Sequence, residues 1–140
     1  MTTPPGIGRI RVERHDGHVL ATLFGLTVLG AGSAFAVFGL PNLPLHGPLH
    51  YAGVMGPLCG MTRAITALLR GDIPTALTYN PAAPLVLLSS VALAIRGLAG
   101  VLTGAWVSWQ WRPSRAAVAV MVTGAVGLAV RQQLHASFLA

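Results

Sequence analysis

The sequence has no lysine, only one cysteine and only three acidic residues. A single cysteine excludes an internal disulfide. Asp72 and the two acids of the tail, Glu13 and Asp16, are not expected to form a carboxylate pair for acid–base catalysis. It also has no nucleophile elbow of the Gly-x-Ser-x-Gly type and no glycine-rich phosphate loop. The sequence therefore favours a protein that is not an enzyme and needs no cofactor, while leaving an activity centred on the cysteine open.

Apolar residues dominate the chain. Hydrophobic residues make up 54% of the 140 positions and charged residues only 9%, which is far from the balance of a soluble domain. The nine basic residues are all arginines and give a formal net charge of +6. They occur singly around apolar runs and not as a continuous basic stripe, which argues against nucleic-acid binding. The composition predicts an integral membrane protein whose partner is the lipid bilayer.

Three apolar runs predict an all-α, polytopic transmembrane protein with a single membrane domain over residues 1–140. The spans are expected at 19–40, 81–105 and 116–131, each able to cross a ~30 Å hydrocarbon core, the last only if its flanking arginines bend outward. A signal peptide is the rival interpretation of the first run, but that run is longer than a usual signal core. Residues 1–18 are expected to be a cytoplasmic tail, and 106–115 a loop of tryptophans and arginines at the membrane surface. Arg96 interrupts the second span, and we expect it to snorkel or to pair in the interior.

The segment 41–80 between the first two spans is broken by glycine and proline. Apolar residues at helical spacing predict a helix from Met61 to Arg70, with Arg63, Thr66 and Arg70 on its polar side. Gly71 suits a helix C-terminus, and Asp72 suits the start of a second short helix. These signals predict a short helical hairpin that lies along the membrane interface or re-enters it.

The distribution of arginines predicts the topology. Three spans place six arginines on one side and three on the other, which by the positive-inside rule puts the amino terminus in the cytoplasm. The expected location is the plasma membrane. The two sets are Arg9, Arg11, Arg14, Arg96, Arg112 and Arg115 against Arg63, Arg70 and Arg131.

The central segment resembles a known family. It reads Cys59-Gly60-Met61-Thr62-Arg63-Ala64, then Arg70-Gly71-Asp72, then Asn80-Pro81. This order resembles the small bacterial membrane proteins catalogued as domain of unknown function 2752, whose mark is Cys-Pro-x-Cys-Gly-x-Thr-Arg-Ala followed by an Arg-Gly-Asp-like turn and an Asn-Pro helix start. The resemblance implies a membrane location and a shared fold, but no activity. Gly56 stands where the family has its first cysteine, which argues against a two-thiol site.

The motif leaves several roles open for its side chains. Arg63 and Arg70 could bind an anion or a partner's carboxylate, or they could pair internally with Asp72, which we favour because charges at membrane depth usually pair. Thr62 and Asn80 are interpreted first as helix caps and second as ligand contacts. Cys59 could be a reactive thiol or a metal ligand with His46 and His50, although a lone cysteine in apolar surroundings is more often inert.

Three functions are compatible with these features. The favoured one is a non-enzymatic accessory or scaffold subunit that docks on a membrane-protein partner, or on further copies of itself, by close packing of small residues and by the Arg63/Arg70/Asp72 turn. The alternatives are a ligand- or ion-handling protein that uses Arg63 and Arg70, and a thiol- or metal-dependent membrane enzyme centred on Cys59.

Overall fold

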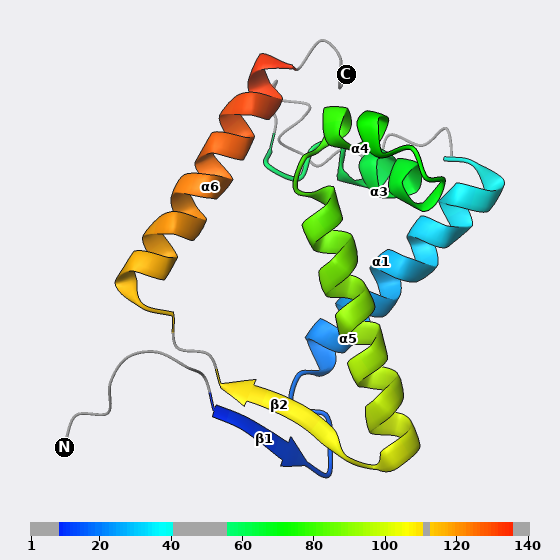
Figure 1. The fold of residues 1–140 in the computed structure, drawn as a ribbon, viewed down its shortest axis with the longest axis vertical. Coiled ribbons are helices and arrows are strands. Elements are labelled where there is room, and N and C mark those ends of the chain that lie inside the picture. The colour runs from blue at the N-terminus through cyan, green and yellow to red at the C-terminus, as the bar shows by residue number, and fades with distance from the viewer. Residues whose placement is uncertain (1–8, 41–55, 111–112, 136–140) are drawn as a thin grey trace.

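Three long apolar helices form the framework of the molecule (Figure 1). The computed structural model describes residues 9–40, 56–110 and 113–135. Helices α1 (Val19–Phe38), α5 (Ala83–Thr103) and α6 (Arg115–Leu134) contain 20, 21 and 20 residues, and each is long and apolar enough to cross a membrane. The predicted multi-pass helical fold is therefore confirmed. Helix α6 continues past the predicted end at residue 131, because its polar last turn is held against another part of the chain.

A helical hairpin lies between α1 and α5 in the sequence, as predicted. Helix α3 (Met61–Leu69) is joined to α4 (Ile73–Tyr79) by a tight turn at Gly71, whose φ of 82° is left-handed. The two short helices sit at one end of the α1–α5 pair (Figure 1). Ala64, Ile65 and Ala67 of α3 are buried there, together with Ala76 and Ala83. Thr66, expected on a polar face, is also buried, and its hydroxyl donates to the Thr62 carbonyl.

Glycines allow α1 and α5 to cross at short range (Figure 1). A Cβ at Gly97 would lie 2.7 Å from Cγ2 of Thr22, and one at Gly25 would lie 2.8 Å from Cβ of Leu93. Neither distance is tolerable, so these glycines set the separation of the two helices. Van der Waals contact through small residues drives such association in lipid, because lipid tails are as apolar as the helices themselves.

Replacing Gly97 by alanine should therefore destabilise the protein. Overpacking a tight contact costs about 1–3 kcal/mol, and here the added methyl group pushes Thr22 away from the polar residues that it binds. The free energy of unfolding in mixed detergent micelles, titrated with a denaturing detergent, measures the loss. Gly30→Ala is the matched control, because a Cβ at Gly30 on α1 meets nothing within 4 Å. Equal stability of the two variants would contradict the packing argument.

A two-stranded antiparallel sheet lies at the other end of the molecule. Strand β1 (Arg9–Glu13) pairs with β2 (Trp106–Gln110), with Val12 opposite Val107. The sequence analysis missed both strands and treated these residues as tail and loop. The sheet brings the segment before α1 to the connection between α5 and α6, so both lie at the same end of the helices (Figure 1). The predicted topology likewise places the amino-terminal segment and the α5–α6 connection on one side of the membrane.

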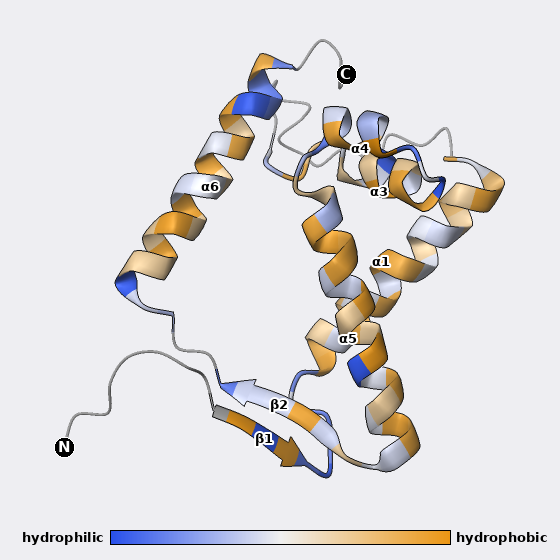
Figure 2. Ribbon diagram, viewed as in Figure 1, coloured by the Kyte–Doolittle hydropathy of each residue, from blue (hydrophilic) through white to orange (hydrophobic). Residues whose placement is uncertain are grey.

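Helix α6 stands apart from α1 and α5 (Figure 1). In its most apolar 18-residue stretch only 6% of the residues are buried, against 17% in the corresponding stretch of each of the other two long helices. Its surface is apolar along most of its length, with blue bands near both ends (Figure 2). Every residue from Val118 to Gly127 is exposed. Within the described residues, α6 is held mainly by its last turn.

Candidate functional site

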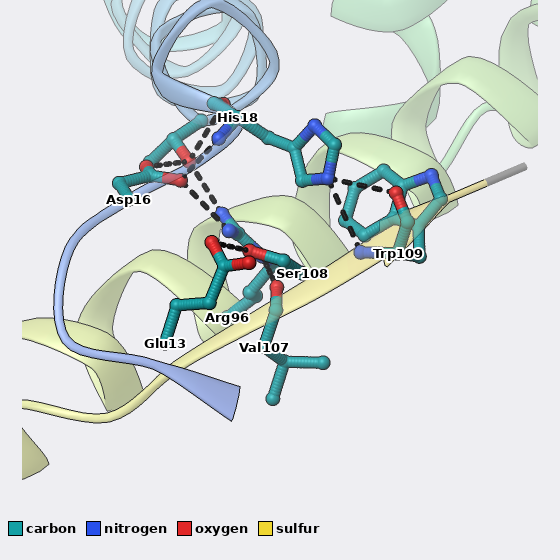
Figure 3. Close-up of polar contacts among 8 residues, drawn as sticks. Glu13, Asp16, His18, Arg96, Val107, Ser108 and Trp109 are labelled. Carbon is teal, nitrogen blue, oxygen red and sulfur yellow. Dashed lines mark hydrogen bonds and ion pairs between the residues drawn. The ribbon is translucent and has the colours of Figure 1, made fainter. Parts of the chain in front are cut away.

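A polar cluster centred on Arg96 joins the sheet to the helices (Figure 3). Arg96 lies on α5, and its Nη2 is 2.7 Å from Oδ1 of Asp16, just before α1. Its Nη1 donates to Oγ1 of Thr22 on α1 over 2.8 Å, and its Nε donates to the carbonyl of Val107 on β2. One guanidinium therefore connects four segments of the chain.

The ion pair of this cluster is almost removed from solvent. The side chains of Arg96 and Asp16 are only 9% and 10% exposed. The guanidinium carbon also lies over the rings of Trp106 and Trp109, 5.7 and 5.4 Å from their centroids. Cation–π contact of this kind strengthens when the cation is desolvated. The expectation that Arg96 would snorkel or pair in the interior is resolved in favour of pairing.

The Arg96 cluster keeps Asp16 ionised. The hydrogen bond from Arg96 is the main cause that lowers the pKa of Asp16 from 3.8 to about 2, and bonds from the Thr22 hydroxyl and the His18 amide act in the same direction. Those two bonds measure 2.6 and 2.8 Å. Burial opposes the shift but does not overcome it. The result is a carboxylate that stays charged at physiological pH beside a fixed cation.

Two further contacts fix the sheet beside this ion pair (Figure 3). The ring of His18 stacks on Trp109 with centroids 4.2 Å apart, and its Nε2 lies 3.2 Å from the Trp109 amide. Ser108, buried on β2, donates to Oε2 of Glu13 over 3.0 Å. Both acids of the amino-terminal segment are therefore engaged by the structure. All these contacts are made within the chain, and the cluster has a structural role: it holds the sheet against α1 and α5.

Asn80 is the predicted motif residue with the most complete set of contacts. Its side chain is fully buried, and Nδ2 donates to the carbonyls of Pro57 and Cys59 over 3.0 and 3.1 Å. Its Oδ1 accepts from the Ala82 amide at the start of α5 over 3.0 Å, as a capping residue does. Asn80 therefore ties the turn that precedes α3 to the beginning of α5.

The predicted ion pair between Asp72 and the two arginines of the motif is not formed. Asp72 caps α4 by accepting from the Thr75 amide over 3.1 Å, and the hydroxyl and amide of Thr75 lower its pKa. Arg70 instead donates to the carbonyls of Ala36 and Phe35 near the end of α1, over 3.0 and 3.1 Å. Backbone carbonyls at a helix C-terminus attract a cation as an acid would, which explains the outcome.

The other motif residues are dispersed around α3. Gly60 is the residue before α3, with a left-handed φ of 74°, so the helix starts there and Thr62 is not its cap. The guanidinium of Arg63 lies over the ring of Tyr79, 5.9 Å from its centroid. Cys59 is partly buried in the turn that Asn80 holds. The metal-site hypothesis depends on His46 and His50, which lie outside the described residues, and it stays a prediction.

The last turn of α6 forms a second polar contact that the sequence did not reveal. Arg131 Nη2 donates to the carbonyls of Leu77 and Thr78, over 3.3 and 3.2 Å. Gln132 is fully buried, and its Nε2 donates to the Tyr79 carbonyl over 3.0 Å. These side chains satisfy carbonyls at the C-terminal end of α4 that have no partner within a short helix.

Comparison with known proteins bears on the hairpin and not on the Arg96 cluster. No curated protein and no solved structure matches the chain. The model of the family described as "Protein of unknown function (DUF2752)" matches residues 49–94, which include α3, α4 and the first half of α5 and end before Arg96. The family resemblance inferred from the motif is therefore confirmed by this match, which covers residues 49–94 of the multi-pass membrane protein.

Proposed function

We propose that the protein is a non-enzymatic accessory subunit of a larger membrane complex, and that α6 is the helix that docks on the partner. The observation that carries the proposal is the uncovered small-residue face of α6. Ala119, Thr123 and Gly127 follow one another at four-residue spacing on this helix, and a Cβ at Gly124 or Gly127 would meet nothing within 4 Å. The predicted location is the plasma membrane, with the amino terminus in the cytoplasm.

The same chain shows what such a face is used for. Between α1 and α5, Gly25 lies against Leu93 and Gly97 lies against Thr22, each so closely that an added Cβ would clash. Helix α6 carries the same residue types at similar spacing, but no other described helix lies against them. A helix that contributes little to its own fold and exposes glycines to lipid is suited to packing against a helix of another protein.

The alternatives have weaker support. Ligand or ion handling through Arg63 and Arg70 would require Arg70 to leave the α1 carbonyls that it now binds. For a thiol- or metal-dependent activity at Cys59, the described residues add no observation in favour. The accessory role rests on a surface that the structure presents, and we therefore prefer it.

Substitution of Gly127 by leucine should abolish the association. A leucine there would hold a partner helix away by several ångströms and remove the close contact. Purification of the protein from its native membranes in mild detergent, with quantitative mass spectrometry of the retained proteins, measures the effect. We expect a partner in stoichiometric amount with wild-type protein, and a loss of about fivefold or more for Gly127→Leu, since overpacking a close contact costs about 1–3 kcal/mol.

Gly30→Leu is the matched control, because Gly30 on α1 also faces open space. It should retain the partner in the wild-type amount. The proposal is wrong if wild-type protein retains no partner, or if Gly127→Leu retains as much as Gly30→Leu. Retention of additional copies of this chain alone would replace the accessory role by a homo-oligomer built through α6.

A further inference from the structure

We propose that the β1–β2 sheet and the first turn of α6 together form a binding surface for the headgroups of anionic phospholipids. This inference does not depend on the accessory role of α6, because it concerns the opposite end of that helix and a different kind of partner. It follows from the charge, the apolar exposure and the position of this end of the molecule.

The net charge at this end is positive. The side chains of Arg11, Arg14 and Arg115 are exposed, and among the described residues no side-chain hydrogen bond or ion pair engages any of them. Of the two nearby acids, Asp16 is paired with Arg96, and Glu13, which accepts from the neutral Ser108 hydroxyl, offsets only one of the three charges. At the opposite end Arg70 and Arg131 bind backbone carbonyls and Arg63 lies over the Tyr79 ring.

The position of Arg115 strengthens the need for an anion. Arg115 is the first residue of α6, and the first turn of this helix contains no acid. A cation at a helix N-terminus is unfavourable, because the positive end of the helix dipole lies there. Ser114 caps this end by accepting from the Ala117 amide over 3.2 Å, but it carries no charge. A guanidinium beside the positive end of the dipole favours an oxygen-rich, negatively charged group, such as a phosphate diester.

Apolar side chains occupy the face of the sheet opposite to the one that carries Arg11, which pairs with Ser108. Ile10, Val12 and Val107 are 74%, 69% and 44% exposed. Val12 lies directly opposite Val107, and Ile10 is two residues away from Val12, so the three share one face of the sheet. The Arg96 cluster and His18 hold the sheet to the helices, but they leave these apolar side chains exposed. The upper acyl region of a bilayer would cover that face.

The position of the strands along the chain places them at the headgroup layer. Strand β1 ends at Glu13, shortly before α1 begins at Val19, and β2 begins at Trp106, shortly after α5 ends at Thr103. Both strands are therefore at the level where the spans leave the hydrocarbon core. Arginine and apolar side chains together at this depth are typical of interfacial elements that bind anionic lipid.

The tryptophans of the chain provide the test, since all three occur within residues 106–111. The full-length protein is reconstituted in two lipid nanodiscs of identical composition, with about one phosphatidylglycerol for every four phosphatidylcholines. In one disc the phosphatidylglycerol carries bromine near the glycerol end of its acyl chains. In the second disc, an equal amount of phosphatidylcholine carries the bromine at the same position, and the phosphatidylglycerol carries none. Bromine quenches tryptophan fluorescence only at short range, so the two discs compare which lipid is the neighbour of the sheet.

Quenching by brominated phosphatidylglycerol should be about twofold stronger, since one arginine near the surface can enrich an anionic lipid by about fivefold. Arg11→Gln, Arg14→Gln and Arg115→Gln should each reduce this ratio, and the triple variant should bring it close to one. Arg63→Gln, which removes a charge at the other end, should leave it unchanged, and circular dichroism checks that each variant is folded. Equal quenching in the two discs for wild-type protein, or an equal loss with Arg63→Gln, would overturn the proposal.

Discussion

Replacing Asp16 by alanine should lower the free energy of unfolding by about 3–5 kcal/mol, the usual consequence of leaving a buried charge without its partner. Arg96 would then keep one hydrogen bond to Thr22 and one to the Val107 carbonyl, but no anion. Because its side chain is only 9% exposed, water cannot replace the carboxylate without opening the contact between the sheet and the helices. Denaturing-detergent titration of the full-length protein, followed by circular dichroism, measures this change.

Two controls isolate the ion pair in that experiment. Glu13→Ala removes the other acid of the same segment, which accepts one hydrogen bond from a neutral hydroxyl and should cost about 1 kcal/mol or less. Adding Arg96→Met to Asp16→Ala should recover much of the lost stability, since an apolar side chain needs no anion. If Asp16→Ala unfolds at the same detergent concentration as the wild-type protein, the ion pair contributes nothing to the free energy of unfolding, and other contacts hold the sheet to the helices.

The pH dependence of stability gives an independent check on the same carboxylate. Its folded-state pKa is about 2 and its ordinary value is 3.8, so the unfolded chain takes up the proton first as the pH falls. The stabilisation is therefore complete above the ordinary pKa and is lost as the pH falls from about 4 towards 2. The Asp16→Ala variant should lack this part of the acid transition, whereas Glu13→Ala should keep it.

Replacing Asn80 by alanine should destabilise the protein by about 2–4 kcal/mol, because three buried backbone groups lose their partners together. These are the carbonyls of Pro57 and Cys59 and the amide of Ala82. Asn80→Asp should cost at least as much, since a carboxylate can accept from Ala82 but cannot donate to the two carbonyls. The same detergent titration reads out both variants.

Thr78→Ala is the comparison for Asn80, because Thr78 lies two residues before it, in the last turn of α4, and its exposed hydroxyl donates only to the Pro74 carbonyl. It should change stability by no more than about 0.5 kcal/mol. A small effect of Asn80→Ala, comparable to that of Thr78→Ala, would show that the 57–60 turn does not need this amide. Asn80 would then be free for a role in binding.

The sequence predicted those parts of the fold that depend on local signals. Long apolar runs located the three long helices, and Gly71 and Asp72 located the turn between α3 and α4, because helix length and capping are encoded within a few residues. The two strands were missed although β1 alternates arginine and apolar residues. Its partner β2 lies about 100 positions away, and no feature of the sequence within either strand indicates that the two pair.

Side-chain partners were predicted less well, for a physical reason. An acid can be found in a sequence by its residue type, so a pairing of Arg70 with Asp72 looked natural. Arg70 and Arg131 instead bind carbonyls at the ends of α1 and α4, and every residue carries a carbonyl. Which carbonyls are free depends on where helices end and what lies beside them. That information appears only in the folded chain.

The separation between the two halves of the Arg96 cluster also sets the order of events during synthesis. Arg96 follows Asp16 by 80 residues. At typical elongation rates of about 5–20 residues per second, Asp16 is made about 4–16 s before its partner exists. Strand β1 waits longer still, since β2 follows Arg96. The segment that contains β1 and Asp16 is thus made before α5, but it can reach its final structure only after α5 has entered the membrane.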